Sequence, residues 1–512
     1  MPIAYEQIPP GTLLPLFYAE VTQAQEPAAS NLKLCLIGHA NKVGFSEGEG
    51  LLDMPYLLSR DDASTLFGRG SMLESMYNRA RSNARWTEIW GIAIPEAVAS
   101  VQAAGTITVS IDATTSLNGF VQFHIAGIPI SMVIRSTETM AAIATRLAGI
   151  INRTVTPVKA VAAGAVVTLT AKWAGVTGNG IVLSYVGPLG RRDSNTPKMR
   201  LTRRFFAFTV MAGGDGESDV SATFASLANR PFDVFAFPFT SVLTQNQCQT
   251  FMDGQAGRWS PYSQKYGHMV SAKIGSLASL TAYGDTRDDP HMTTMGLWQS
   301  ILPSWDWAAS LAALMVTHWA VPPELSRPLQ TLELRGMYVG ADDDQSFSPE
   351  ERQLLLESGI STFSVSDDGT CHIDRVRTLR KTNAYGDPDP SWADAITMFQ
   401  AMYFARQMRR TITGAFPRAA LTNDDLGITG YASPGLIKLV IMHEYKRLQA
   451  LGLVENYDLF VQSLIVERDL TDRGRVNTML RPDFVNQLRI VAAVIETHLE
   501  LDASDPLISV AA

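Results

Sequence analysis

The sequence predicts an α/β protein in which a mostly parallel sheet is covered by helices on both faces. Three observations support this class. Short apolar runs of strand length alternate with helical segments along most of the chain, as in βαβ units. Residues 96–203 break this rhythm with a composition rich in Thr, Val, Ala and Gly. Both ends of the chain have strand-like patterns without an evident partner close by in the sequence, which favours pairing with other chains.

The α/β part is expected to contain short buried strands separated by amphipathic or buried helices. The apolar runs predict strands at Leu32–Ile37, Glu88–Ile94, Phe208–Ala212, Asp233–Phe237, His268–Ile274, Met292–Leu297 and Leu332–Val339. Helices are expected at Ser71–Ser82, Ser218–Asn229, Gln245–Gly254, Leu277–Tyr283, Pro303–Trp319 and Ser348–Ser358. The last of these helices has a strong start, because Ser348 can cap it and Pro349 fits its first turn.

The stretch 96–203 is predicted to be a small inserted α+β domain. Strands are expected at Thr106–Ile111, Phe120–Ile125, Ile128–Ile134, Val158–Ala171 and Ile181–Val186, with one helix at Thr137–Ile151. Because the α/β pattern resumes at Phe208, the insertion interrupts a larger domain. The predicted domains are an N-terminal arm 1–30, a discontinuous core 31–95 and 204–378, the insertion 96–203, a C-terminal domain 379–487 and a C-terminal arm 488–512.

The region after Thr378 is predicted to be mostly helical. Its first helix carries Trp392, Ile396, Phe399 and Tyr403 along one face. A second helix is expected to start at the cap Ser433 and to stop at Gly452. Between residues 401 and 450 there are seven Lys or Arg against three Asp or Glu. This basic excess fits a solvated helix face and a partner-binding face equally well.

The two ends of the chain are expected to form strands that pair with neighbouring copies. Residues 12–21 are apolar on both faces, but Pro9, Pro10 and Pro15 restrict this segment to a sheet edge or to another chain. At the other end, residues 495–501 alternate strictly between apolar and polar side chains. The predicted contact residues of these arms are Leu14, Leu16, Phe17, Tyr18, Val21, Ile490, Val491, Val494, Ile495 and Leu499.

Composition excludes several classes of protein. The chain of 512 residues is 46% hydrophobic and 18% charged, so it can bury several cores. A formal net charge of −8 gives no basic footprint for nucleic acid. Three widely spaced cysteines favour a reducing compartment over a disulfide scaffold or a structural zinc site. No secretory signal is expected, and the most apolar stretch, Trp307–Val321, is too short to span a bilayer.

Motifs for enzyme chemistry are incomplete. His443 and Glu444 begin the zinc-protease pattern HExxH, but Arg447 occupies the place of the second zinc ligand and a cation cannot bind zinc. The chain has no GxSxG elbow, no GxxxxGK[ST] loop and no GxGxxG fingerprint. The glycine-rich turn Gly213–Ser218 has only half of a phosphate-binding fingerprint, so a plain strand-to-helix connection explains it better.

Acidic clusters leave one enzymatic alternative open. Asp285, Asp288, Asp289 and His291 form one cluster, and Asp342, Asp343 and Asp344 form another, both after predicted strands. Either could bind a hard cation such as Mg²⁺, which would suit an α/β hydrolase. Ordinary turns use the same residue types, and we prefer that explanation. His39 and His124 stand alone in the sequence, so packing roles are expected for them. We expect no catalytic residue, no metal and no cofactor.

Several stretches, in this order and spacing, resemble the tail sheath proteins of contractile bacteriophages, in particular the Mu-like branch. They cover most of the chain: IPPGTLLPLFYAEVTQAQ leading into LKLCLIGHAN, TAKWAGVTGNGIVLSYVG, MAGGDGESDVSATFASLANRPFDVFAFPFT, and RTLRKTNAYGDPDPSWADAITMFQAMYFARQMRRTITGAFPRAALTND. The resemblance implies a core of subtilisin-like topology, an outward-facing insertion and a C-terminal domain that faces an inner tail tube. Subtilisin catalysis is not implied, because the strings HGT and GTSMA around the protease His and Ser are missing.

The resemblance also implies a function. The subunit would polymerise helically around the tail tube by strand exchange between neighbours, and the sheath would contract to drive the tube through the host envelope. Lys438, Lys446 and Arg447 are the expected tube-facing residues. Expected partners are identical subunits, the tube protein, and the baseplate and tail terminator proteins, in a virion tail assembled in the host bacterial cytoplasm. A sheath subunit of a non-phage contractile injection system is an alternative that the sequence leaves open.

Overall fold

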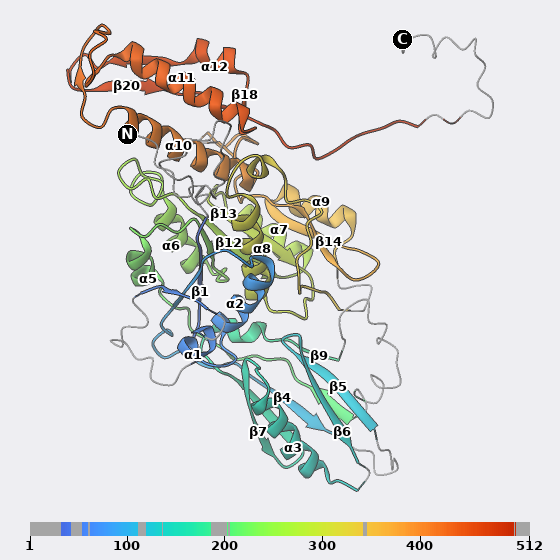
Figure 1. The fold of residues 1–512 in the computed structure, drawn as a ribbon. Coiled ribbons are helices and arrows are strands. Elements are labelled where there is room, and N and C mark those ends of the chain that lie inside the picture. Colours follow the sequence, from blue (N-terminus) through green and yellow to red (C-terminus); the bar gives the residue numbers. More distant parts are fainter. Residues whose placement is uncertain are drawn as a thin grey trace, which may run out of the picture.

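A central α/β body lies between a β-rich lobe and a helical C-terminal region (Figure 1). The computed structural model describes residues 32–41, 54–59, 62–110, 119–135, 137–185, 202, 205–340, 346–383, 385–495 and 497. The five N-terminal arm residues named above, together with Leu499 and Asp342–Asp344, lie outside these ranges.

The body is built on an eight-stranded sheet in the order β15-β14-β13-β12-β11-β1-β3-β2. All pairings from β14 across to β3 are parallel, while the two edge strands, β15 and β2, pair antiparallel. The predicted mostly parallel sheet is therefore confirmed. The strands are β1 (Leu34–Gly38), β2 (Tyr56–Leu57), β3 (Ile89–Ala93), β11 (Val234–Ala236), β12 (His268–Ile274), β13 (Met292–Leu297), β14 (Ile360–Val365) and β15 (Cys371–Arg375).

Among its described residues, the body contains the six helices that the sequence predicted, together with one short helix and one 3₁₀ turn that it did not predict. They are α1 (Asp62–Phe67), α2 (Met72–Asn83), α5 (Ser221–Leu227), α6 (Val242–Met252), α7 (Leu277–Asp285), α8 (Ser304–His318), α9 (Pro349–Glu357) and the 3₁₀ turn η2 (Glu324–Ser326). Ser71, Ser241 and Ser276 cap their helices through the side-chain oxygen. Ser348 and Glu351 form a capping box at the start of α9, which confirms the strong start predicted there.

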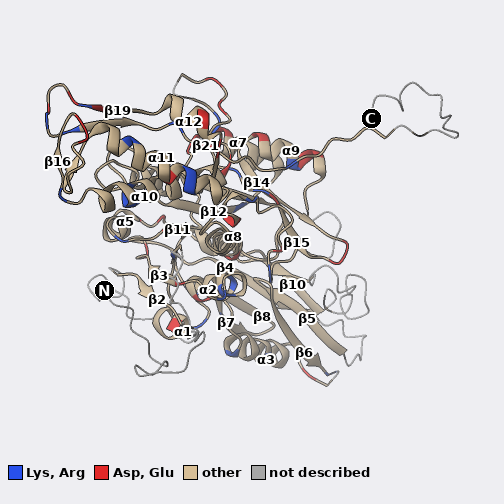
Figure 2. Ribbon diagram, turned by 45° about the horizontal axis from the view of Figure 1, so that its top comes forward, with Lys and Arg blue, Asp and Glu red and all other residues tan. Residues whose placement is uncertain are grey.

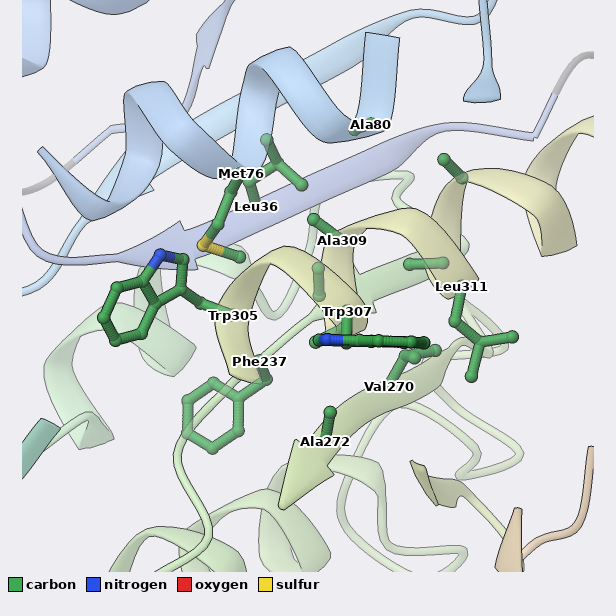
Figure 3. Close-up of a cluster of buried hydrophobic side chains, with 14 of the residues drawn as sticks. Leu36, Met76, Ala80, Phe237, Val270, Ala272, Trp305, Trp307, Ala309 and Leu311 are labelled. Atoms are coloured by element: carbon green, nitrogen blue, oxygen red, sulfur yellow. The ribbon is translucent and has the colours of Figure 1, made fainter. Parts of the chain in front are cut away.

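Helix α8 forms the centre of the core. All of its residues from Trp305 to Val316 are buried, because α2 covers it on one side and β12 and β11 on the other. Figure 3 shows Trp305 and Trp307 reaching toward side chains from α2, β1 and β12. The buried carboxylate of Asp306 accepts hydrogen bonds from Ser75 at 2.6 Å and from Arg79 at 3.0 Å, so its charge is paired. The apolar stretch therefore forms a core helix, as predicted.

The β-rich lobe comprises the elements from β4 to β10. These are β4 (Ala104–Val109), β5 (Gly119–Ile125), β6 (Ile128–Ile134), α3 (Met140–Arg153), β7 (Val158–Ala163), β8 (Val166–Ala171), η1 (Val176–Gly180), β9 (Leu183–Ser184) and β10 (Phe206–Phe208). They form a four-stranded sheet, β10-β4-β8-β7, and a three-stranded sheet, β6-β5-β9. The single predicted helix is present as α3. Whether residues 96–203 form a separate domain stays a prediction.

Three expected strands differ from the structure. Phe208–Ala212 was expected in the core sheet, but the strand is β10, and it pairs antiparallel with β4 of the lobe. Val158–Ala171 is a hairpin of β7 and β8, because Gly164 turns the chain with φ +59°. Leu332–Val339 forms no regular strand among the described residues: the chain contacts the edge of β15 through Glu333 and then turns at Gly336, whose φ is +76°.

The lobe is joined to the body by close contacts. Trp173 is fully buried, with its ring centroid 6.3 Å from that of His39 and 5.5 Å from that of Trp305. Glu96 accepts a hydrogen bond from the backbone N–H of Ala174 at 2.9 Å. At Gly70, a Cβ atom would lie 2.2 Å from the carbonyl oxygen of Thr156, so only glycine permits this approach.

The C-terminal region combines long helices with three two-stranded sheets. Its elements are α10 (Ala395–Ala415), β16 (Ala420–Leu421), β17 (Tyr431–Ala432), α11 (Pro434–Ala450), β18 (Val454–Glu455), α12 (Tyr457–Ser463), β19 (Ile465–Arg468), β20 (Val476–Met479) and β21 (Asp483–Phe484). Ser433 caps α11, and Gly452 follows its end with φ +75°, both as predicted. Arg406 of α10 binds Asp233 of the body at 2.6 Å and so ties the two regions together.

Candidate assembly surfaces

The C-terminal segment, residues 488–495, leaves the body with its apolar side chains in solvent. Leu488, Ile490, Val491, Val494 and Ile495 are between 73% and 89% exposed. None of these residues belongs to a strand or bridge in the described chain. Figure 1 shows the segment extending away from the C-terminal region. So many adjacent exposed apolar side chains are typical of a surface that another molecule covers.

An ion-pair cluster holds the root of this segment. Arg375 of β15 binds both carboxylate oxygens of Asp394, at 2.9 and 3.0 Å, and Arg489 binds one of the same oxygens. Burial alone would raise the pKa of Asp394, but the hydrogen bonds from Arg375 and the charge of Arg489 outweigh it and hold that pKa below its ordinary value. Sequence reasoning missed this cluster, because its members are far apart along the chain.

The hairpin β19–β20 is a two-stranded sheet with both outer edges unpaired by other strands of the described chain. Ile465 and Met479, which are opposite each other in the hairpin, are nearly half exposed. Two strands alone make a marginal sheet, and open edges offer backbone donors and acceptors to an added strand. The hairpin lies at the left of the C-terminal region and the C-terminal segment leaves to the right in both views (Figures 1 and 2).

The predicted tube-facing residues lie on α11, but they differ in surroundings. Lys438 is partly buried, and Lys446 is exposed with its ammonium 5.8 Å from the ring centroid of Tyr457. Arg447 donates two hydrogen bonds to the buried carboxylate of Glu444, which raises the pKa of the guanidinium. Figure 2 shows basic and acidic residues mixed over this region. Lys438 and Lys446 therefore remain the better candidates for contact with a partner.

The acidic cluster after α7 forms contacts within the protein. Asp288 accepts hydrogen bonds from the backbone N–H of Lys381 at 2.8 Å and from the Thr382 hydroxyl at 2.6 Å. Asp289 is buried and accepts from the backbone N–H of His291 at 2.7 Å. Burial raises the pKa of Asp289 to about 6 and lowers that of His291 to about 4. Among the described residues, no three His, Cys, Asp or Glu side chains lie close enough to hold a metal ion.

The carboxyl ends of β1, β11 and β12 line a cavity of about 370 Å³, the place where α/β enzymes commonly bind ligands. His39 and Lys273 are among its lining residues. His39 packs against Phe239 at 5.3 Å, and burial lowers its pKa to about 3. His124 is also buried, in the lobe, and burial lowers its pKa as well. The burial of both histidines agrees with the packing roles expected for them. In the described chain, no helix is long and apolar enough to cross a membrane.

Comparison with known proteins identifies the family. Residues 213–379 match the model of the phage tail sheath protein central domain, and residues 387–497 match that of the phage tail sheath C-terminal domain. Together the two matches span more than half of the chain. The Mu-like prophage FluMu tail sheath protein of Haemophilus influenzae is 29% identical over 504 residues, which cover 97% of this chain and 99% of that protein.

Solved structures of sheath proteins show a more distant likeness. The sheath tail protein of Desulfitobacterium hafniense has a TM-score of 0.45 at 13% identity and covers 91% of this chain and 100% of its own. The protein from Listeria innocua has a TM-score of 0.46 at 11% identity and covers 89% and 96%. The contracted helical sheath of the anti-feeding prophage has a TM-score of 0.44 at 10% identity and covers 96% and 100%. The two family-model matches, together with the full-length similarity to a Mu-like prophage tail sheath protein, show that this chain belongs to the phage tail sheath family.

Proposed function

We propose that this structural subunit of a contractile tail sheath polymerises around an inner tail tube by exchanging strands with its neighbours. The observation that carries the proposal is the C-terminal segment, whose apolar side chains find no cover in the described part of their own chain. A strand added to a neighbour's sheet gains backbone hydrogen bonds, and its alternating side chains gain a surface to cover. Because donor and acceptor sites differ, each copy can add another, and the contact produces an open polymer.

The hairpin β19–β20 is the acceptor that we propose for an exchanged strand. Its edges are open, and its position on the side opposite the departing segment directs that segment toward a different subunit (Figure 1). An arm of this kind forming about five backbone hydrogen bonds, each contributing ~1 kcal/mol, would hold neighbours together by several kcal/mol. The N-terminal arm, residues 1–30, is proposed to take part in the same exchange.

Contraction in this proposal requires two packings of the subunit bodies and no nucleotide. The arms act as tethers that persist in both packings, while the extended sheath is held by a kinetic barrier. The core is proposed to have subtilisin-like topology within residues 31–95 and 204–378. The insertion, residues 96–203, faces outward, and the C-terminal domain, residues 379–487, faces the tube. Release of the stored free energy drives the tube through the host envelope.

The tube contact is proposed to include Lys438 and Lys446, which would meet acidic side chains of the tube protein. Contacts between charges suit an interface that must separate on contraction, because they bury little apolar surface and weaken with salt. Baseplate and tail terminator proteins are the partners proposed for the two ends of the sheath. The subunit is proposed to assemble in the cytoplasm of the host bacterium.

The alternatives carry less support. The full-length relative is named as a prophage protein, which favours a phage tail over another contractile injection system. A magnesium-dependent hydrolase would need free carboxylates, yet Asp285 and Asp288 are engaged with Lys381 and its neighbours. We propose that this cluster has a structural role and that the protein is not an enzyme.

Point variants of the full chain test strand exchange. Val494→Pro removes a backbone donor from the segment, and Ile490, Val491 and Ile495 changed together to Ser remove its apolar surface. Both variants should keep the thermal stability of the wild type, since these side chains are exposed. In electron microscopy the wild type should form tubes, and both variants should fail to form them. Val98→Ser, at a site 97% exposed elsewhere, is the control. Wild-type tubes from both arm variants would refute strand exchange by this segment.

A further inference from the structure

The last contact between the C-terminal segment and its own body is a single arginine. The chain leaves the β18–β21 sheet after Val485, whose N–H binds the carbonyl of Leu453 at 3.1 Å. Arg489 then binds the carboxylate of Asp394, and its other terminal nitrogen lies 2.5 Å from the Gln487 side chain. Beyond it, no hydrogen bond or ion pair joins residues 490–495 to the rest of the described chain.

Asp394 is committed to this junction. It precedes α10 at the N-cap position, where an aspartate commonly accepts hydrogen bonds from the first turn of its own helix. Its oxygens accept from Arg375 and Arg489 instead. In the ion pair of Asp394 with Arg489 both side chains are mostly buried: that of Asp394 is 14% exposed and that of Arg489 is 22% exposed. A pair in this setting is screened less by salt than one on the surface. The bidentate contact from Arg375 fixes the orientation of the Asp394 carboxylate, to which Arg489 donates through one terminal nitrogen.

We infer that Arg489 is a positioning residue, which through Asp394 fixes where the C-terminal segment leaves the body and in which direction it points. The inference rests on the proposed function, since that segment is the arm which neighbours share. Without the pair, only a long hydrogen bond from the Gln330 side chain to the Leu488 carbonyl, 3.4 Å, holds the chain between Val485 and the arm. Once that weak bond opens too, four more residues, about 13 Å of extended chain, join the free arm. A longer and less directed arm searches a larger volume, which lowers its effective concentration at the neighbour's acceptor edge.

The ion pair also connects the arm to the central body and to the C-terminal region. Arg375 lies on β15 at the edge of the central sheet, and Asp394 begins the helix that opens the C-terminal region. Arg489 therefore attaches the arm where body and C-terminal region meet. When the packing of the subunit bodies changes, the attachment at Arg489 moves with its own body. The arm therefore keeps its orientation relative to that body.

The test compares full-length Arg489→Gln, Arg489→Lys and the control Arg481→Gln, which changes an exposed arginine nearby. A spin label at Val491→Cys and another at Glu357→Cys on α9 report the spread of distances between arm root and body in the monomer. The native cysteines are buried, so labels go to the new sites. Arg489→Gln should broaden the distribution, Arg489→Lys should restore most of the narrow one, and Arg481→Gln should leave it unchanged.

Assembly kinetics complete the test. Arg489→Gln should form tubes about tenfold more slowly than the wild type at equal concentration, with partial rescue by Arg489→Lys. An unchanged distance distribution in Arg489→Gln overturns the inference, and so does a broadened distribution with wild-type assembly. The two proposals can fail separately. Wild-type tubes from both arm variants, Val494→Pro and the triple change to Ser, refute strand exchange, whereas the spin-label distances in the monomer test the Arg489 anchor by themselves.

Discussion

The guanidinium of Arg447 lies 2.6 and 2.9 Å from the two carboxylate oxygens of Glu444, one turn earlier on α11. Glu444 is buried, while Arg447 is partly exposed. The arginine thus neutralises a buried acid of its own helix, and its charge is not free for a partner. A charge reversal that includes Arg447 would damage the fold and could not report on the tube contact.

We predict that Arg447→Met destabilises the protein by about 3 kcal/mol, because it leaves the Glu444 carboxylate buried without its partner. Lys446→Met is the matched control, since it removes a neighbouring exposed cation and should cost less than about 1 kcal/mol. Urea unfolding followed by circular dichroism measures both. Equal stabilities for the two variants would show that the pair contributes little.

The double reversal Lys438→Glu and Lys446→Glu should leave stability almost unchanged, because both ammonium groups are at or near the surface. It should reduce assembly of the sheath on purified tubes, with the largest effect at low salt, where contacts between charges are strongest. Co-sedimentation with tubes at several salt concentrations measures this. Wild-type co-sedimentation at low salt would remove these residues from the tube contact.

Gly70→Ala should destabilise the joint between body and lobe by more than about 3 kcal/mol. The new Cβ would lie 2.2 Å from the Thr156 carbonyl oxygen and 2.5 Å from the Lys172 ammonium, in a backbone with φ +76°. Gly213→Ala is the control, because Gly213 has φ +75° but open space around it, so it carries the backbone strain of about 1 kcal/mol without the clash. Thermal unfolding measures the stability of both variants. Equal losses of stability in Gly70→Ala and Gly213→Ala would contradict the close packing at Gly70.

Asp289 gives a prediction for pH. Its pKa is raised by burial to about 6 from an ordinary 3.8, so the folded state favours the protonated acid. The resulting stability is present below pH 3.8 and is lost as pH rises through about 6. Relative to Asp289→Asn, which keeps an oxygen for the His291 N–H, the wild type should lose about 2 kcal/mol of unfolding free energy between pH 4 and pH 7. If the unfolding free energies of the two proteins changed with pH in the same way, the pKa of Asp289 would not be raised in the folded state.

Local chemistry determined much of this protein. The Ser348 capping box, the stop of α11 at Gly452 and the buried helix α8 follow from residues adjacent in sequence, and all were predicted. The alternation of short apolar runs with helices predicted the parallel sheet, and the change in composition marked the lobe. The pattern of the C-terminal segment predicted a strand that pairs with a neighbour, and this stays a prediction, because such pairing needs a second subunit.

Tertiary structure decided which distant residues meet. Strand β10 has a composition suited to either sheet, and its pairing with β4 depends on where the lobe closes. The residues Arg375, Asp394 and Arg489 are spread over more than a hundred positions, so no local pattern could reveal their cluster. The charge of Arg447 looked free in sequence because burial of Glu444 is a property of the packed helix pair. Hydrophobic periodicity and helix capping depend on residues a few positions apart. The pairing of strands and the burial of side chains depend on the whole fold.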